Sequence, residues 1–142
     1  GFYCYAIDPD ELSTRHALDV AGVDGAHTGT LEDFNCDRTF DIISFNKVLE
    51  HVPDPIRALT TATGLLSNRG VTYIELPDAD GALSNGDVVD REEFYVEHFT
   101  IFTAPSLEYL ANASGLRMIE SRAIHEPSDK YTLYAFLERA NQ

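Results

Sequence analysis

The sequence is poor in basic residues and has no long apolar run. Its 142 residues include 10 Lys and Arg but 24 Asp and Glu, so the formal net charge is −14. This charge would repel a phosphate backbone, which excludes nucleic acid as a partner and disfavours anionic membranes. There is no signal peptide and no apolar stretch approaching about 18 residues. We therefore expect a soluble cytoplasmic protein without a membrane partner.

Cysteine is also scarce. Cys4 and Cys36 are the two cysteines, too few for a disulfide framework in a chain of this length. Cys4 stands in an apolar run, where we expect a small core residue. The histidines have no metal-ligand spacing with the cysteines or with each other, so no metal site is predicted. The histidines are His16, His27, His51, His98 and His125.

Apolar residues are nevertheless plentiful, at 44% of the sequence, and they indicate one globular domain over residues 1–142. Four short apolar segments bounded by turn residues predict buried parallel strands. These segments are residues 2–8, 40–45, 71–76 and 131–137. Residues 26–29 could add a short strand, and the alternating segment 117–123 could form an edge strand.

Three helical patterns lie between these segments. Each begins at a capping residue or a proline and ends before a glycine. The paired start and end residues are Asp10 and Gly22, Pro55 and Gly70, and Thr103 and Gly115. The positions expected to face the core are Leu12, Ala17, Val20 and Ala21 in the first helix, Ile56, Leu59, Thr63 and Leu66 in the second, and Leu107, Leu110, Ala111 and Ser114 in the third.

Alternating strands and helices predict an α/β fold, with a Rossmann-like, mostly parallel sheet and helices on both faces. The connection between segments 117–123 and 131–137 is too short for a crossover helix. We therefore expect these two strands to form an antiparallel hairpin that closes the sheet. The acidic segment 77–93 is interpreted as a long loop, which is typical of a lid, a substrate loop or a disordered segment.

Polar residues follow three of the predicted strands, at the sheet edge where open α/β proteins bind ligands. Asp8 is placed to accept hydrogen bonds from the ribose hydroxyls of a nucleoside, unless it only caps the next helix. The loop 29–34 could read an adenine edge or be a solvated turn. Glu50 and His51 could hold a cationic ligand or move a proton, or be structural.

Several of these segments resemble class I S-adenosylmethionine-dependent methyltransferases. The run FDIISFNKVLEHVPDP, followed later by LLSNRGVTYIELPD, resembles the family's fourth-to-fifth-strand region. YAIDPDELSTRHA resembles its second strand and the next helix, and GTLEDF resembles its adenine-side loop. EHFTIFTAPSLEYLANASGL is similar to a late segment of the small-molecule branch. The resemblance covers nearly the whole chain.

The resemblance implies a set of contacts to the cofactor S-adenosylmethionine. Asp8 would bind the ribose hydroxyls. Thr30 stands where many relatives have an Asp facing the adenine amine, and Leu31 would offer its backbone N–H and pack on the ring. Asn46 would present its backbone near the methionine part. Glu50 and His51 would line the junction of donor and acceptor.

The acceptor side implied by the resemblance is a small molecule. Methyl transfer from a sulfonium is an in-line displacement, so the protein mainly aligns the reactants, and an acidic pocket tolerates the cation. An acceptor with a hydroxyl or an acidic carbon is helped by a base, and His51 or His98 could serve. The other interpretation of His98 is a core or supporting role.

The family's glycine-rich loop after the first strand has no counterpart in this sequence, so we expect a domain that is incomplete at its N-terminus. In the family, that first strand lies between the second and the fourth. We therefore predict that segments 2–8 and 40–45 pair directly, or that another chain fills the gap, which leaves a homo-oligomer open. Two other functions also remain open. One is a degenerate, non-catalytic interaction domain, and the other is a nicotinamide-dependent oxidoreductase, whose cofactor ribose Asp8 would suit equally well.

Overall fold

The computed structural model describes residues 1–85, 91–94 and 97–140. The chain divides into two compact units, Gly1–Asp37 and Arg38–Gln142. Within the described residues, no helix is long and apolar enough to cross a membrane.

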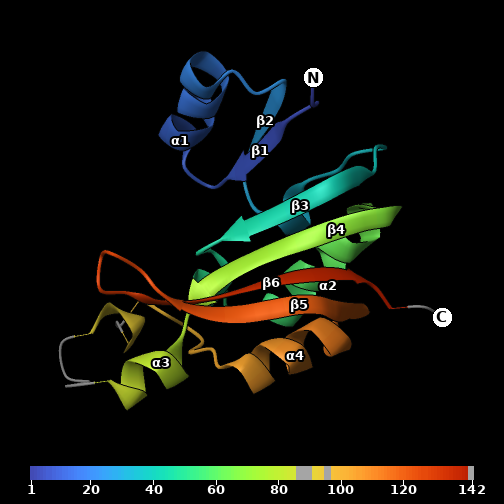
Figure 1. Cartoon of the computed structure of the whole chain (residues 1–142). Helices are drawn as coiled ribbons and strands as arrows, with labels where there is room; N and C mark the ends of the chain where they lie inside the picture. The colour runs from blue at the N-terminus through green and yellow to red at the C-terminus, as the bar shows by residue number, and fades with distance from the viewer. Residues whose placement is uncertain (86–90, 95–96, 141–142) are drawn as a thin grey trace. The chain divides into compact units, whose positions relative to one another are not determined.

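The first unit is a small strand–helix–strand element (Figure 1). Strand β1 (Tyr5–Asp8) pairs in parallel with β2 (Gly25–Thr28). This confirms the short strand predicted at residues 26–29. Helix α1 (Glu11–His16) joins them and continues as the π-helical turn η1 (Ala17–Ala21). The side chain of Asp10 accepts the amides of Leu12 and Ser13, and Gly22 ends the helical segment in the left-handed region. The predicted start and end of this helix are therefore confirmed.

The core predicted for this unit is partly wrong. The strand begins at Tyr5, so Phe2 and Cys4 lie outside it and are exposed. Leu12 and Val20 are exposed as well, and Thr14 is the buried residue of the helix. A sheet of two short strands has too little surface to cover a whole helix face, because each strand presents only every second residue to it.

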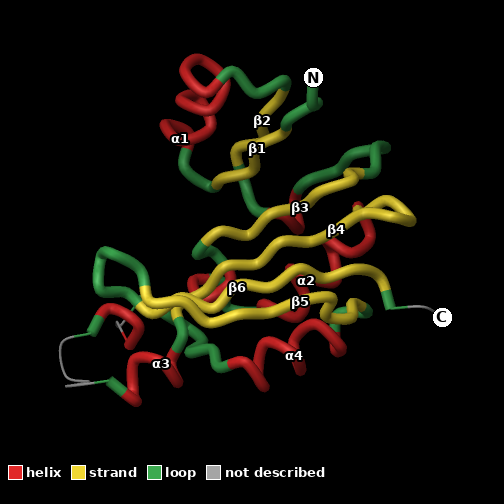
Figure 2. Tube along the Cα trace, viewed as in Figure 1, coloured by secondary structure: helices red, strands yellow, loops and turns green. Residues whose placement is uncertain are grey.

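The second unit is built on a mixed sheet with strand order β3-β4-β6-β5 (Figure 2). Strand β3 (Phe40–Asn46) is parallel to β4 (Leu66–Pro77). Strand β6 (Tyr131–Arg139) runs antiparallel to both β4 and β5 (Leu116–His125). The predicted hairpin and edge strand are confirmed.

The pairing predicted between segments 2–8 and 40–45 would join the two units and stays a prediction. Within the units, strand β1 hydrogen-bonds to β2 and β3 hydrogen-bonds to β4. Each strand takes the partner that its own crossover helix delivers, α1 for β1 and α2 for β3. Pairing with another chain stays a prediction.

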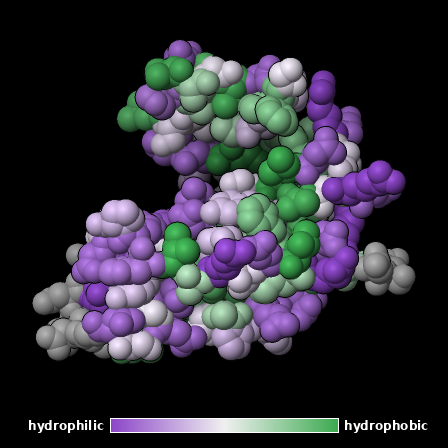
Figure 3. Space-filling model, in the orientation of Figure 1, coloured by the Kyte–Doolittle hydropathy of each residue, from purple (hydrophilic) through white to green (hydrophobic). Residues whose placement is uncertain are grey.

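Helices α2 (Pro55–Leu65) and α4 (Ala104–Ala113) pack on one face of this sheet and against each other. Alternate residues of β4 (Thr72, Ile74 and Leu76) are buried. The other sheet face carries Tyr73 and Phe136, whose ring centroids are 5.2 Å apart. Figure 3 shows hydrophobic side chains reaching the surface among hydrophilic ones.

The predicted helix boundaries hold at α4 and fail at the end of α2. Thr103 and Ser106 form a capping box, and Gly115 follows α4 with a φ of 76°. By contrast, α2 ends at Leu65, and Gly70 lies inside β4. A Cβ on Gly70 would lie 2.9 Å from the carbonyl oxygen of Phe40. This glycine therefore permits the close approach of β3 and does not end the helix.

The segment 77–93 is not a continuous loop. Helix α3 (Ala79–Ser84) follows β4 directly, and the side chain of Asp78 caps it by accepting the amide of Asp80. A short 3-10 turn, η5 (Glu92–Phe94), follows. The prediction of a long loop is wrong for residues 79–84, and residues 86–90 lie outside the described residues.

Candidate functional site

The carboxyl end of β3 leads into a sharp turn that presents two adjacent ionisable side chains. Lys47 has a φ of 52°, and its amide donates to the carbonyl of Glu75 at 2.8 Å. The short turn η3 (Leu49–His51) follows at once. Leu49 and Glu50 are buried there, whereas His51 is exposed. The backbone reversal at Lys47 therefore brings Glu50 and His51 to the edge of the sheet.

A distant segment completes the site by crossing this turn. The carbonyl of Glu50 accepts the amides of Phe99 at 2.8 Å and Thr100 at 3.4 Å. These bonds hold His98 beside the β3 turn, and the ring centroids of His51 and His98 are 4.8 Å apart. The structure therefore brings together Glu50, His51 and His98, three residues that the sequence predicted for the site.

Both imidazoles are oriented by backbone carbonyls. Nδ1 of His51 lies 3.2 Å from the carbonyl of Glu97, and Nδ1 of His98 lies 3.1 Å from that of Glu93. A carbonyl can only accept a hydrogen bond, so each neutral ring carries its proton on Nδ1. Nε2 of each ring is then the nitrogen with a free lone pair.

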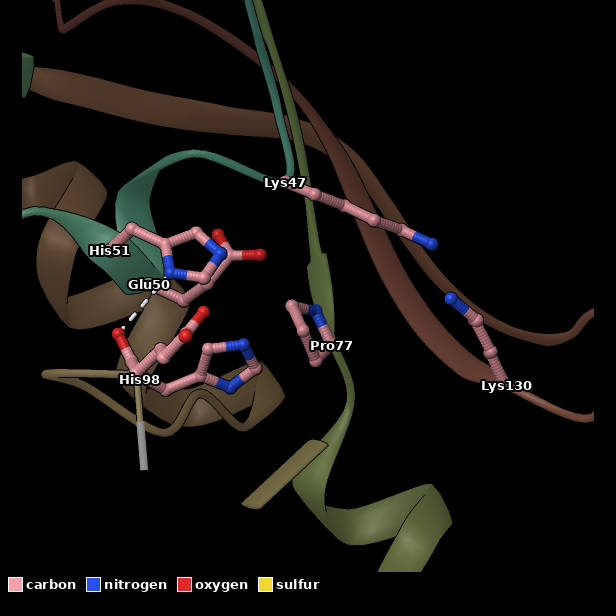
Figure 4. Close-up of a pocket in the computed structure, with 7 residues that line it drawn as sticks. Lys47, Glu50, His51, Pro77, His98 and Lys130 are labelled. Carbon is pink, nitrogen blue, oxygen red and sulfur yellow. Dashed lines mark hydrogen bonds between the residues drawn. The ribbon is translucent and has the colours of Figure 1, made fainter. Parts of the chain in front are cut away.

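These side chains line a cavity of about 480 Å³. Figure 4 shows the carboxylate of Glu50 and the rings of His51 and His98 on one side of Pro77, with Lys47 and Lys130 on the other. The residues that line the cavity are Lys47, Glu50, His51, Pro77, Glu97, His98 and Lys130. Sequence reasoning missed Lys47, Pro77, Glu97 and Lys130, because no local pattern shows which loops meet.

Glu50 is the unusual member of this group. It is 1% exposed, and its Oε2 atom has no hydrogen-bond partner among the described residues. Burial raises the pKa of the Glu50 carboxyl, while its own backbone amide and the nearby His51 and His98 act to lower it. A buried carboxylate oxygen without a partner is costly. The presence of this unpaired oxygen in Glu50 points to a ligand or a function that requires the carboxylate.

The cationic side of the cavity is partly neutralised. Lys47 Nζ lies 3.0 Å from Glu126 Oε1 and 3.9 Å from Glu75 Oε1. Hydrogen bonds from Thr132, Lys47 and Ser128 lower the pKa of Glu126 to about 2. The Lys47 charge is therefore held away from the imidazoles by its carboxylate partners.

The predicted adenosine contacts lie in the other unit. Asp8 ends β1, its Oδ1 accepts the amide of Asp10 at 2.8 Å, and its carbonyl accepts the amide of Gly29 at 3.0 Å. Thr30 and Leu31 follow β2, so all three predicted residues stand at the carboxyl ends of the paired strands. The Thr30 hydroxyl donates to Asp33 Oδ2 at 2.8 Å, within a capping box of the turn η2 (Leu31–Asp33).

Asn46 differs from the other predicted residues of the second unit. It ends β3, its side chain is exposed, and it is not among the residues that line the cavity. The roles assigned to Asn46, Asp8, Thr30 and Leu31 stay predictions.

The parallel strand pairs with crossover helices, together with a polar site at their carboxyl ends, define a Rossmann-like ligand-binding protein. A family model described as a methyltransferase domain matches residues 1–121, and the chain belongs to this methyltransferase family. The sequence is 29% identical over 73 residues to the ubiquinone biosynthesis O-methyltransferase of Haemophilus ducreyi. This match covers 47% of the chain and 31% of that protein.

Solved structures show the same fold. The 1,6-didemethyltoxoflavin-N1-methyltransferase of Burkholderia thailandensis, bound to S-adenosylhomocysteine, gives a TM-score of 0.75 at 18% identity, covering 99% of this chain and 63% of that one. The N-methyltransferase NodS of Bradyrhizobium japonicum, also with S-adenosylhomocysteine, gives 0.72 at 13% identity, covering 96% and 66%. The predicted fold class is confirmed, and the chain spans under two thirds of the length of the toxoflavin enzyme.

Proposed function

We propose that this chain takes part in S-adenosylmethionine-dependent methyl transfer to a small-molecule acceptor. The observation that carries the proposal is the cavity at the carboxyl end of β3, where Glu50, His51 and His98 converge. Membership of the methyltransferase family supports it, as do the relatives that bind S-adenosylhomocysteine.

The residues of the first unit fit the adenosine half of this cofactor. Asp8 offers a carboxylate at a strand end, which suits two ribose hydroxyls. Leu31 offers an apolar side chain beside the loop that follows β2. S-adenosylmethionine, when bound, supplies an electrophilic methyl group on a cationic sulfonium. The formal charge of −14 is compatible with a cationic ligand.

The acceptor side is the cavity of the second unit. Because Nδ1 of His51 and of His98 donates to a backbone carbonyl, Nε2 of each ring can accept a proton from an acceptor hydroxyl. The backbone bonds also fix the ring orientations before an acceptor arrives, which lowers the entropic cost of aligning the reacting groups. His51 and His98 are therefore the candidate bases, and Glu50 is the residue that we assign to the donor side of this cavity.

A small acceptor suits the dimensions and charge of this site. A volume of about 480 Å³ is in the range of small-molecule pockets. The acidic balance of the chain disfavours a nucleic-acid acceptor. The cytoplasmic location and self-association stay predictions.

Binding of S-adenosylhomocysteine to the purified chain tests the proposal. With no glycine-rich loop in this sequence, binding measured by calorimetry should be weak, and Asp8→Ala should abolish it. Asp19→Ala should leave it unchanged, because this substitution removes the same charge from the exposed turn η1. NAD⁺ should give no heat. Preference for NAD⁺ would favour the oxidoreductase, and no binding of either ligand at millimolar concentration would favour the non-catalytic alternative.

A further inference from the structure

Three side chains of the cavity form a set of metal donors. One carboxylate oxygen of Glu50 and one ring nitrogen each of His51 and His98 lie within 4.8 Å of one another. They come from the η3 turn and from a segment far along the chain, so no sequence spacing reveals them. We propose that Glu50, His51 and His98 bind a divalent transition-metal ion, with Zn²⁺ as the best match to the donors.

The hydrogen bonds around the two imidazoles fit metal binding. Metal-binding histidines usually donate their other ring N–H to a carbonyl or a carboxylate, which fixes the tautomer and aims the free nitrogen at the ion. His51 and His98 both do this through Nδ1, with the carbonyls of Glu97 and Glu93. Both rings and Glu50 line the same cavity, and Figure 4 shows the three side chains together on one side of Pro77.

The buried oxygen of Glu50 provides an independent argument. At 1% exposure, Glu50 has lost nearly all contact with water, and Oε2 has no partner among the described residues. Buried charges in proteins are paired or coordinate metals. A cation between Glu50 and the two imidazoles would satisfy this oxygen. Glu97 adds a second carboxylate to the same cavity wall.

The donor types select the ion. Two imidazole nitrogens and one carboxylate suit zinc and its transition-metal neighbours, whereas magnesium and calcium prefer oxygen ligands. A tetrahedral Zn²⁺ holds its ligand atoms about 3.4 Å apart, so the side chains would close by up to about 1.4 Å on binding. Three protein ligands leave a coordination position open toward the cavity.

The proposal stands apart from the proposed methyl transfer, because it needs neither cofactor nor acceptor. If both hold, the ion occupies the Nε2 atoms of His51 and His98, and these cannot then act as bases. The ion would instead lower the pKa of an acceptor hydroxyl at its open position. A bound ion would also show that the prediction of no metal site, which is based on histidine spacing alone, is wrong.

Titration of the chelator-stripped chain with Zn²⁺ tests the site directly. We expect one saturable ion per chain by calorimetry. Glu50→Gln, His51→Gln and His98→Gln should each weaken binding by about tenfold or more. The control His125→Gln also removes one imidazole, but from the end of β5 outside the cavity, and should leave the affinity unchanged. No saturable binding, or equal losses in His98→Gln and His125→Gln, would overturn the proposal.

A second measurement covers variants that fail to fold. With Co²⁺ in place of Zn²⁺, the unmutated chain should show the visible absorption of a tetrahedral nitrogen and oxygen site, without a thiolate charge-transfer band. A thiolate band would assign the ion to Cys4 or Cys36 and contradict the proposal. In ¹⁵N spectra, Zn²⁺ should shift Nε2 of His51 and His98, while the Nε2 of His125 stays unchanged.

Discussion

Replacing Glu50 by methionine should stabilise the protein while removing its function. Glu50 is almost fully buried, and one of its carboxylate oxygens has no partner among the described residues. Methionine has a similar length, fills the same space and needs no hydrogen bond. In the absence of metal, the Glu50→Met variant avoids the cost of burying an unpaired carboxylate oxygen. Its free energy of unfolding should therefore be higher than that of the unmutated chain. Functional sites often carry such a cost.

The size of the gain follows from the single unpaired oxygen. Leaving a buried acceptor without a partner costs about 1–3 kcal/mol, and more when the group is charged. A gain of about 2 kcal/mol corresponds to roughly 6–10 °C in Tm for a chain of this length. The same substitution should abolish Zn²⁺ binding, so stability and function should change in opposite directions.

Calorimetric unfolding at neutral pH, in the presence of a chelator, measures the effect. Glu108→Met is the matched control, because it removes the same negative charge from an exposed position of α4. We expect the control to stay within about 0.5 kcal/mol of the unmutated chain. If Glu50→Met lowers Tm as a core truncation does, the carboxylate is a satisfied structural group and the reasoning is refuted.

Three further predictions concern stability. The pKa of Glu126 is lowered to about 2 from an ordinary 4.5, chiefly by the hydrogen bond from Thr132 and then by those from Lys47 and Ser128, so these bonds stabilise the fold above pH 4.5. That contribution is lost as the pH falls toward 2, so the Tm difference between the unmutated chain and Glu126→Gln should shrink between pH 5 and pH 2 in thermal scans. Thr103→Ala removes the cap of α4 and should cost about 1 kcal/mol in urea unfolding, whereas unchanged stability would mean that the cap is not formed. Gly70→Ala places a Cβ against the backbone oxygen of Phe40 and should lower the free energy of unfolding by about 1–3 kcal/mol; a stabilising effect would contradict the close approach of the two strands.

Local signals account for the parts of the fold that the sequence predicted well. Thr103, Pro105 and Gly115 specify the start and end of α4 through capping and the left-handed region, and α4 forms as expected. Gly70 looked like the same kind of signal but marks a close approach between two strands. A glycine required by a neighbouring strand cannot be distinguished from a helix end without the tertiary structure.

The candidate site was predicted in pieces. The sequence indicates the Glu50–His51 pair because the pair follows an apolar strand, and it indicates His98 without showing which residues lie beside it. Only the structure shows that Phe99 and Thr100 bind the Glu50 carbonyl and so place His98 beside the pair. The contributions of Pro77 and Lys130 to the same cavity have no local signal at all.

The sequence by itself determined the alternation of strands and helices, the caps of α1 and α4, the closing hairpin and the acidic balance. These depend on side-chain period, backbone preference and charge, which act over a few residues or over the whole composition. The tertiary structure decided which strands pair, which apolar residues are buried, and which ionisable groups share a cavity. Those outcomes depend on contacts between distant segments. The sequence lacks the residue spacing typical of metal ligands. This spacing does not show whether Glu50, His51 and His98 come together in the fold, because His98 is distant in sequence from the other two.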